Sequence, residues 1–372
     1  LDTVRLVGDV NSSRSSNISN RVGTNGKSIG NAGNVFIKTK ILEGNGSFAI
    51  GSATFGRGNA GKVTIEATDK ISFDGGGFSS GIGSLVTPSA IGNADDIVIT
   101  TPSLSLSNSA QIATSTLGQG NASNIQINAT DSISFSGGSI VQAASFGSGN
   151  AGNININAEN ANIAFDAANL TTQTSATGKG GDIIIKGRLL SLNNGSKLST
   201  DAGFSSSPNP GNAGNIEISV AENISLSDNS QLTSQSFSKA NAGNLNLSAN
   251  SVFLNSKSTL STSSFNSANA GNITIDAKDN VSSDNSSILT AYSDLLGNNN
   301  TVGKGGDINI QGNSLTFTNK SLIGSSTLGR GNAGNLQLKA NKSISITGGT
   351  TVQALTAGAG NAGNININAE NA

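Results

Sequence analysis

A five-residue segment, most often Gly-Asn-Ala-Gly-Asn, recurs at nearly constant intervals and constrains the fold more than any other feature of the sequence. Each occurrence is termed an anchor. The twelve anchors begin at Gly30, Gly58, Gly92, Gly120, Gly149, Gly178, Gly211, Ala240, Ala268, Gly303, Gly331 and Gly360. Their spacings are 28, 34, 28, 29, 29, 33, 29, 28, 35, 28 and 29 residues. Self-similarity at this period is typical of solenoids and propellers.

The residues between anchors form short segments of alternating polarity. Five and seven residues after each anchor start, all 24 positions are Ile, Leu or Val, as in Val35 and Ile37. The residue between them is mostly polar, which is the pattern of a strand with one buried face. A second apolar pair follows, as in Ile133 and Phe135. A third segment usually carries one large apolar residue: Ile112, Leu170, Leu198, Leu232, Leu260, Leu289 or Val352.

Three short strands in about 28 residues make one coil of a solenoid, because a propeller blade needs four strands in roughly 40–50 residues. No segment shows a helical period. We therefore predict an all-β fold: a right-handed, single-stranded parallel β-helix (β-solenoid) of about 12 rungs of 28–35 residues, with three short strands per rung. Residues 30–372 are expected to be one continuous repeat array. Residues 1–29 match loosely, as the end of a preceding coil or an irregular lead-in, and the array looks truncated at both ends.

Equivalent residues of successive rungs should stack in columns. The second anchor position is Asn in ten of twelve rungs, and the fifth is Asn in eight and Asp in three. We expect amide ladders there, at a corner whose tight geometry Asn tolerates. Another column lies three residues before the anchor and contains Phe55, Leu117, Phe146, Phe237, Phe265 and Leu328. We interpret it as internal packing at a corner, with a ligand-stacking stripe as the alternative.

Three rungs are longer, and their extra residues are placed just before the next anchor, near residues 84–91, 203–210 and 292–302. Insertions in a solenoid often lie on its binding face, although they can also be tolerated surface variation. If this chain binds a glycan, we expect the contacts in these long loops, at Phe204, Tyr292, Asn298, Asn299 and Asn300.

The composition excludes several kinds of chemistry. The chain has no His and no Cys, which removes Ser-His-Asp catalysis, cysteine nucleophiles and nearly all zinc sites. A net charge of −1 argues against nucleic-acid binding, and no run of 18 apolar residues predicts membrane insertion. We expect no catalytic residue, metal or cofactor.

Acidic residues leave one enzymatic alternative, a carbohydrate-active β-helix that cleaves polysaccharides with clustered carboxylates. Asp95 and Asp96 are adjacent and should face opposite ways, and Asp182 and Asp307 share a column several rungs apart. Two Gly-Lys-Gly-Gly-Asp segments, at Gly178 and Gly303, faintly resemble calcium-binding repeats and are better interpreted as degenerate anchors. An ice-binding face would need an unbroken Thr column, which Ala and Gln interrupt here.

The repeat resembles the large filamentous-haemagglutinin-like exoproteins of bacteria, especially the cyanobacterial type. The resemblance rests on units such as residues 149–158, 116–122 and 132–139, and extends from about Gly30 onward. It implies two-partner secretion through a dedicated outer-membrane pore protein, and a secreted or surface-attached rod used in adhesion. The family's N-terminal secretion domain is not in this sequence. The absence of Cys fits passage of an unfolded chain through such a pore.

Our hypothesis from the sequence is therefore a non-catalytic structural and adhesive shaft of a secreted or surface-attached bacterial exoprotein. The partners we expect are the pore protein, for the parent chain, and a surface polysaccharide or a host or neighbouring cell surface. The alternatives are the carbohydrate-active β-helix, a passive spacer and an ice-binding solenoid.

Overall fold

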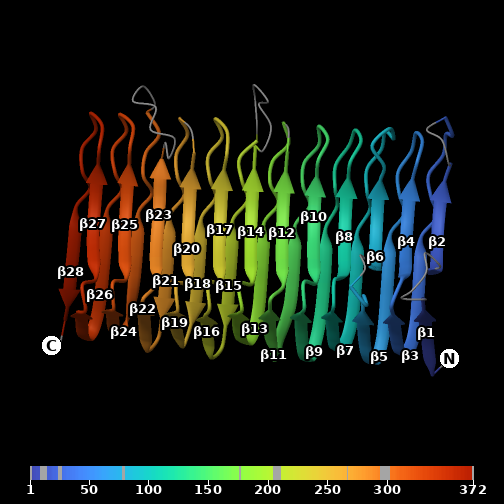
Figure 1. Cartoon of the computed structure of the whole chain (residues 1–372), viewed down its shortest axis with the longest axis horizontal. Coiled ribbons are helices and arrows are strands. Elements are labelled where there is room, and N and C mark those ends of the chain that lie inside the picture. Colours follow the sequence, from blue (N-terminus) through green and yellow to red (C-terminus); the bar gives the residue numbers. More distant parts are fainter. Residues whose placement is uncertain are drawn as a thin grey trace. The chain divides into compact units, whose positions relative to one another are not determined.

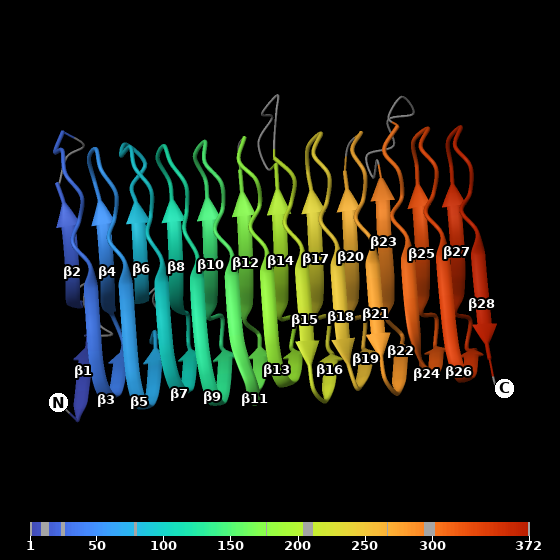
Figure 2. The same cartoon turned by 180° about the vertical axis from the view of Figure 1, so that it is seen from behind.

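The chain is an all-β solenoid of parallel strands, seen in a computed structural model that describes residues 2–8, 15–23, 27–77, 80–175, 177–203, 211–265, 267–293 and 302–370. For Ser287 and residues 289–293 only the backbone is described. The chain divides into two compact units, Leu1–Gly187 and Arg188–Ala372, and strand β13 (Ile183–Asn193) spans the boundary. Figures 1 and 2 show the strands of each unit lying side by side from two opposite directions.

Unit 1 contains two parallel sheets built from alternate strands of the chain. The first sheet holds, in order, β1 (Thr3–Val7), β3 (Val35–Asn45), β5 (Val63–Asp74), β7 (Ile97–Ser107), β9 (Ile125–Ser136) and β11 (Ile154–Asp166). The second sheet holds β2 (Ser16–Val22), β4 (Phe48–Thr54), β6 (Ser80–Val86), β8 (Ala110–Thr116), β10 (Ile140–Ser145) and β12 (Asn169–Thr174). Each strand therefore pairs with the equivalent strand one turn away.

Unit 2 repeats this arrangement. Its first sheet holds β15 (Ile216–Val220), β18 (Leu245–Ala249), β21 (Ile273–Ala277), β24 (Ile308–Thr318), β26 (Leu336–Ile346) and β28 (Ile365–Ala369). A row of three shorter strands, β16 (Asn223–Leu226), β19 (Ser251–Asn255) and β22 (Asn280–Asp284), joins this sheet through the pairing of β22 with β24. The second sheet holds β14 (Lys197–Ala202), β17 (Gln231–Ser236), β20 (Thr259–Ser264), β23 (Ser287–Ser293), β25 (Leu322–Thr327) and β27 (Thr351–Thr356).

The predicted β-solenoid is confirmed, with two refinements. The units together hold about 11 turns, because twelve anchors delimit eleven complete intervals. Three separate strands per turn occur only where β15/β16, β18/β19 and β21/β22 are divided. Elsewhere the first two predicted strands join into one strand of 11 to 13 residues, as in β3 and β11. A register shift at the join, such as that between Asn157 and Asn162, allows the strand to bend while its pairing resumes.

The core consists of the apolar residues that the alternation predicts. Ile97, Ile99 and Leu104 are no more than 1 % exposed. In the register of the first sheet, Ile97 pairs with Val63 on one side and Ile125 on the other. Stacking like residues at each turn removes their side chains from water, and each buried Ile or Leu contributes about 1.5–3 kcal/mol. This column of apolar residues is the main source of stability within each unit.

The anchors form the expected ladders, and the bonding joins side chains to backbone. Where an anchor has Asn or Asp at the second or fifth position, the side-chain Oδ1 commonly accepts the backbone N–H of the equivalent residue one turn later. Asn59 N donates to Asn31 Oδ1 at 2.8 Å, and Asn244 N donates to Asn215 Oδ1 at 2.9 Å. Asp307 acts in the same way, since its Oδ1 accepts the N–H of Asn335 at 2.7 Å. The Asp-containing segments are thus degenerate anchors in structure as well as in sequence.

A row of inward hydroxyls ties the second sheet to the anchor corner. Ser52, Ser234 and Ser325 each accept an N–H from the fourth anchor residue nine positions later, at 2.7 to 2.8 Å. Thr262 donates from the equivalent position to the carbonyl of Gly271 at 2.6 Å. These side chains are buried, so the hydrogen bonds satisfy polar groups that water cannot reach.

Three predictions were wrong: two concern packing and one concerns the position of extra residues in a long rung. In the second sheet Ile288, not Leu289, pairs with Leu260 and Ile323 and is fully buried. Two adjacent apolar residues left the phase of that strand ambiguous. The Phe/Leu column lies at the surface and not in the core: Leu117 is 40 % and Phe146 is 37 % exposed, and the other four members are half-buried. Within it, the rings of Phe237 and Phe265 stack with centroids 4.7 Å apart.

The third error concerns the first long rung, which has six residues more than the rung that follows it. Only two of them precede the anchor at Gly92, in the segment 87–91 that corresponds to 117–119. Three lie between β5 and β6, where five residues replace the two between β7 and β8, and one lies in the bulge of β5. The long rungs therefore do not all project from one corner.

Candidate functional site: an outer-face groove in unit 1

The outer face of the second sheet in unit 1 presents three columns of side chains. The strand register defines them. The first column is Asn17, Ala49, Gly81 and Gln111, the second is Ser19, Gly51, Gly83, Ala113 and Gln142, and the third is Arg21, Ala53, Leu85 and Ser115. Residues between these columns, such as Ile50 and Ile82, point inward and are buried.

A groove forms along these columns because β4 and β6 carry almost no outward side chains. Five of their six outward positions are Gly or Ala. At Gly51 a Cβ would lie 2.1 Å from the carbonyl oxygen of Gly83, so the close approach of the two strands requires glycine there. At Gly83 the nearest atom to a Cβ would be the Ala113 carbonyl oxygen at 3.8 Å, so that position is open toward the groove.

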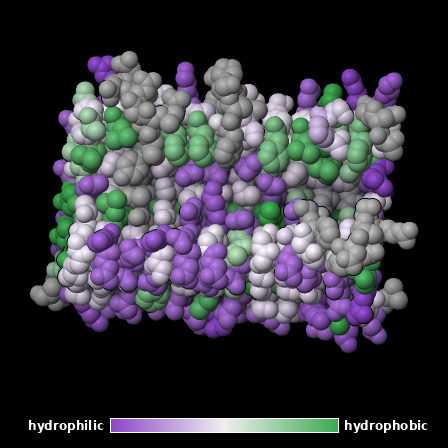
Figure 3. All heavy atoms as spheres, in the orientation of Figure 1, coloured by the Kyte–Doolittle hydropathy of each residue, from purple (hydrophilic) through white to green (hydrophobic). Residues whose placement is uncertain are grey.

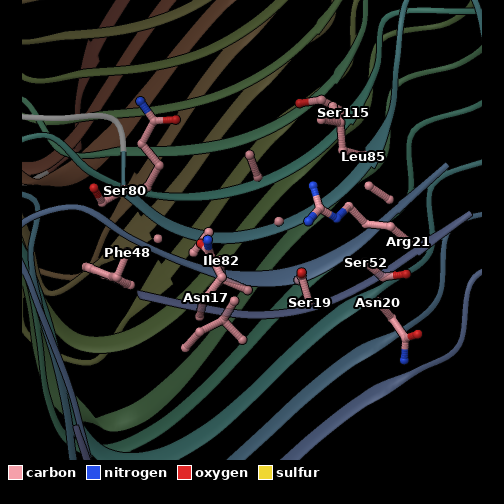
Figure 4. A pocket seen from close by; sticks show the side chains of 18 of the residues that line it. Asn17, Ser19, Asn20, Arg21, Phe48, Ser52, Ser80, Ile82, Leu85 and Ser115 are labelled. Carbon is pink, nitrogen blue, oxygen red and sulfur yellow. The ribbon is translucent and has the colours of Figure 1, made fainter. Parts of the chain in front are cut away.

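The groove has a volume of about 510 Å³ and a mixed rim. Amide side chains of Asn17, Gln111 and Gln142 line it, together with the partly exposed Leu117 and Phe146. Figure 4 shows Arg21 beside Leu85 and Ser115, the residues of its own column, with Asn17 and Phe48 away from them. Figure 3 shows one face of the molecule, coloured by hydropathy. Most of its described surface is hydrophilic or neutral, and the hydrophobic side chains form separate small groups.

The chemistry of the groove is that of binding. Of its described lining residues only Arg21 is charged, and the rest are amides, hydroxyls and apolar groups. Amides donate and accept hydrogen bonds, as do the hydroxyls of a sugar. A shallow floor of Gly and Ala offers a flat apolar surface, and an exposed aromatic ring can stack on an apolar ring face. Such a lining can hold a polyhydroxylated ligand through hydrogen bonds and apolar contact.

A second hollow of about 510 Å³ lies over the bulges of β5, β7, β9 and β11. It is lined by Ala67, Thr68, Thr100, Thr101, Pro102, Asn128, Ala129, Thr130, Asn157, Glu159 and Asn160. Without an aromatic or large aliphatic side chain among these residues, it offers less contact area to a ligand than the groove.

In unit 2, Asp201 is a buried carboxylate on the outer face of β14. Its side chain is only 5 % exposed, and Lys197 Nζ lies 3.4 Å from its Oδ2. Burial raises the pKa of Asp201 above its usual value, and Lys197 counteracts this only in part. The other oxygen, Oδ1, is buried and has no hydrogen-bond partner. A carboxyl group of this kind stays protonated to a higher pH than an exposed one.

The structure describes little of the residues predicted to bind ligand. Phe204, Asn298, Asn299 and Asn300 lie outside the described residues. Tyr292 lies in β23, where its backbone pairs with Ser326, and its side chain is not described. The glycan contacts in the long loops stay a prediction. The outer-face groove was missed, although Gly and Ala at alternate positions of residues 49–53 and 81–83 were a visible signal.

No protein-family model, curated protein or solved structure matches the chain. Within the described ranges, there is no group of three or more acidic residues placed to hold a metal ion. The same residues include no helix long and apolar enough to cross a membrane. The structure thus shows a β-solenoid repeat protein. Only the resemblance of the repeat sequence indicates a protein family.

Proposed function

We propose that the chain is a structural and adhesive shaft of a secreted or surface-attached bacterial exoprotein, and that its role is binding rather than catalysis. The observation that carries this proposal is the open groove in unit 1, set on the face of a sheet whose strands β4 to β10 are paired with a neighbour on each side. A ligand there must be held by side chains. Many weak polar contacts on a stiff support suit attachment to an extended surface polymer.

The hydrogen-bonding of the corners supports a rigid shaft. Anchor ladders connect successive turns, and buried hydroxyls connect the second sheet to the anchors, as in the pair Ser234 and Gly243. Such repeat stacks are stabilised mainly by contacts between neighbouring turns. Stability therefore does not depend on disulfides, and the chain has no Cys.

The resemblance to filamentous-haemagglutinin-like exoproteins adds the route and the partners to this proposal. The parent protein would be exported through an outer-membrane two-partner-secretion pore and act at the cell surface. Its external partner would be a surface polysaccharide, or the surface of a host or neighbouring cell. The repeated anchors in residues 149–158 and 331–335 support this relationship.

Binding of the purified 372-residue chain to immobilised polysaccharides and to whole bacterial and host cells tests the proposal. Saturable binding to at least one of these surfaces is expected. Binding to none of them would leave a passive spacer, with adhesion located elsewhere in the parent protein. A β-solenoid of unrelated sequence serves as the control for nonspecific adsorption.

A carbohydrate-active enzyme is the second candidate, and Asp201 is the observation that favours it. General acids of glycosidases are carboxyl groups whose pKa is raised by their surroundings, as burial does for Asp201. Those enzymes use a second carboxylate facing the first across the scissile bond. The candidate therefore requires a partner acid near β14 in addition to Asp201.

A further inference from the structure

The groove in unit 1 is oriented across the strands. Its lining comes from five successive strands of one sheet, β2, β4, β6, β8 and β10. Neighbouring strands in a sheet lie about 4.8 Å apart, so five strands span about 19 Å from the first to the last. A ligand that uses the whole lining is therefore elongated and runs from turn to turn, perpendicular to the strands.

The repeat of the groove matches the repeat of an extended polysaccharide. In an extended, β-linked chain of pyranose rings, each sugar advances the chain by close to the spacing between strands. Such a chain can place roughly one sugar over each strand without losing register along the groove. The second column, from Ser19 through Gly83 to Gln142, would then meet one sugar at each strand.

The lining also matches the surfaces of a sugar ring. The Gly and Ala floor leaves room for the flat apolar face, and the ring of Phe146, 37 % exposed, offers a stacking surface at one end. The amides of Asn17, Gln111 and Gln142 can donate to and accept from equatorial hydroxyls. A polypeptide fits less well, because peptides that add to sheets need a free strand edge and this groove lies on a sheet face.

The charge of the lining selects among polysaccharides. Arg21 is the only charged residue among the described lining residues, so a polyanion would meet one cation in a span of five strands. A polycation would meet no carboxylate there. We infer that the groove binds one linear, uncharged, β-linked glycan chain that runs across β2 to β10. This inference rests on the proposed function and names its ligand class and its site.

Calorimetric titration of the whole chain with linear β-linked glucose oligosaccharides of increasing length tests this inference. The dissociation constant should fall with length and level off at about five sugars, one per strand of the groove. It should change little with added salt, because no charges are neutralised. A uronate oligosaccharide of equal length is the comparison, and tighter, salt-sensitive binding of the uronate would overturn the assignment to neutral glycans.

Gly83→Thr places a β-branched side chain in the middle of the floor at a position where the Cβ meets nothing closer than 3.8 Å. Gly324→Thr is the matched control, on β25 in unit 2, where the nearest atom to the Cβ is Gln353 Cγ at 3.4 Å. Gly83→Thr should weaken binding about tenfold or more, and Gly324→Thr should not. Melting temperatures of both variants equal to that of the unmodified chain show that folding is retained.

Phe146→Ala provides a second variant that should also weaken binding, through loss of the stacking surface. If Gly83→Thr and Phe146→Ala bind the oligosaccharides as the unmodified chain does, the groove is not the site. If no neutral oligosaccharide binds while whole cells are still bound, this inference fails and the adhesive function stands. If neither oligosaccharides nor cells are bound, the proposed function fails as well.

Discussion

The hydroxyl of Ser234, inside the second sheet of unit 2, lies 2.8 Å from the backbone nitrogen of Gly243 and accepts its hydrogen bond. The same hydroxyl donates to the carbonyl of Gly214 at 2.9 Å. One buried side chain thus joins a strand to the anchors of two successive turns. The equivalent bonds from Gly61 to Ser52 and from Gly334 to Ser325 make this link a recurring part of the fold.

Ser234→Ala should lower the free energy of unfolding by about 1–3 kcal/mol, because the N–H of Gly243 would be buried without a partner. The Gly214 carbonyl keeps its bond from Thr200, so one orphan group is expected rather than two. Denaturant unfolding measures the loss. Ser219→Ala, at an exposed position of β15, is the control and should stay within about 0.5 kcal/mol. Equal losses of stability in both variants would show that the buried hydroxyl has no special structural role.

At the fifth anchor position, the oxygen that accepts the next turn's N–H comes from an amide in some turns and from a carboxylate in others. Asn244 Oδ1 accepts the N–H of Asn272 at 2.8 Å, and Asp307 makes the equivalent bond to Asn335. Asn244→Ala should therefore cost about 0.5–1.5 kcal/mol of stability, and Asn244→Asp distinctly less. Thermal melting of the two variants compares them, and a greater loss for the Asp variant would show that the amide group itself is needed.

Asp201 should make stability fall as pH rises. Its pKa in the folded chain is raised above the ordinary 3.8, so the folded state binds its proton more firmly than the unfolded state does. The protonated carboxyl stabilises the folded state most below pH 3.8, and this stabilisation is lost as the pH rises through the raised pKa. Asp201→Asn should therefore melt at a higher temperature than the unmodified chain at neutral pH, with the difference shrinking in acid. A variant that is less stable at neutral pH would mean that the ion pair with Lys197 outweighs burial.

The two glycines of the groove floor should respond differently to the same substitution. Gly51→Ala would bring a methyl group to within 2.1 Å of the Gly83 carbonyl oxygen and must displace a strand, whereas Gly83→Ala meets no atom closer than 3.8 Å. A measurable drop in melting temperature is expected for Gly51→Ala, and little change for Gly83→Ala. Similar effects at both positions would contradict the strand geometry from which the groove is built.

The sequence was sufficient to predict the repeat, the strand type and most of the core. Ile97 and Ile99, five and seven residues after an anchor, are completely buried, because twelve anchors fix the phase of the alternation. The phase was lost where apolar residues are adjacent, at Ile288 and Leu289. The inward position of Ser234 was not predicted, because hydropathy alone does not distinguish a buried, hydrogen-bonded hydroxyl from an exposed one.

The candidate site was harder to predict than the fold. A groove depends on missing side chains, here at Gly51 and Gly83, and on the register that aligns β4 with β6. Sequence spacing alone does not give that alignment, because three extra residues between β5 and β6 shift it relative to the next turn. The sequence instead indicated the long loops, which contain aromatic and amide residues such as Tyr292.

Release of reducing ends from the polysaccharide that the chain binds best tests most directly whether this solenoid binds its ligand or cleaves it. The chain is incubated with that polysaccharide at saturation, and new reducing ends are measured over time beside the Asp201→Asn variant. A binding solenoid should retain the polysaccharide with no release above the buffer control for either protein. A steady release that Asp201→Asn abolishes would contradict the proposed binding function and identify the chain as a carbohydrate-cleaving enzyme.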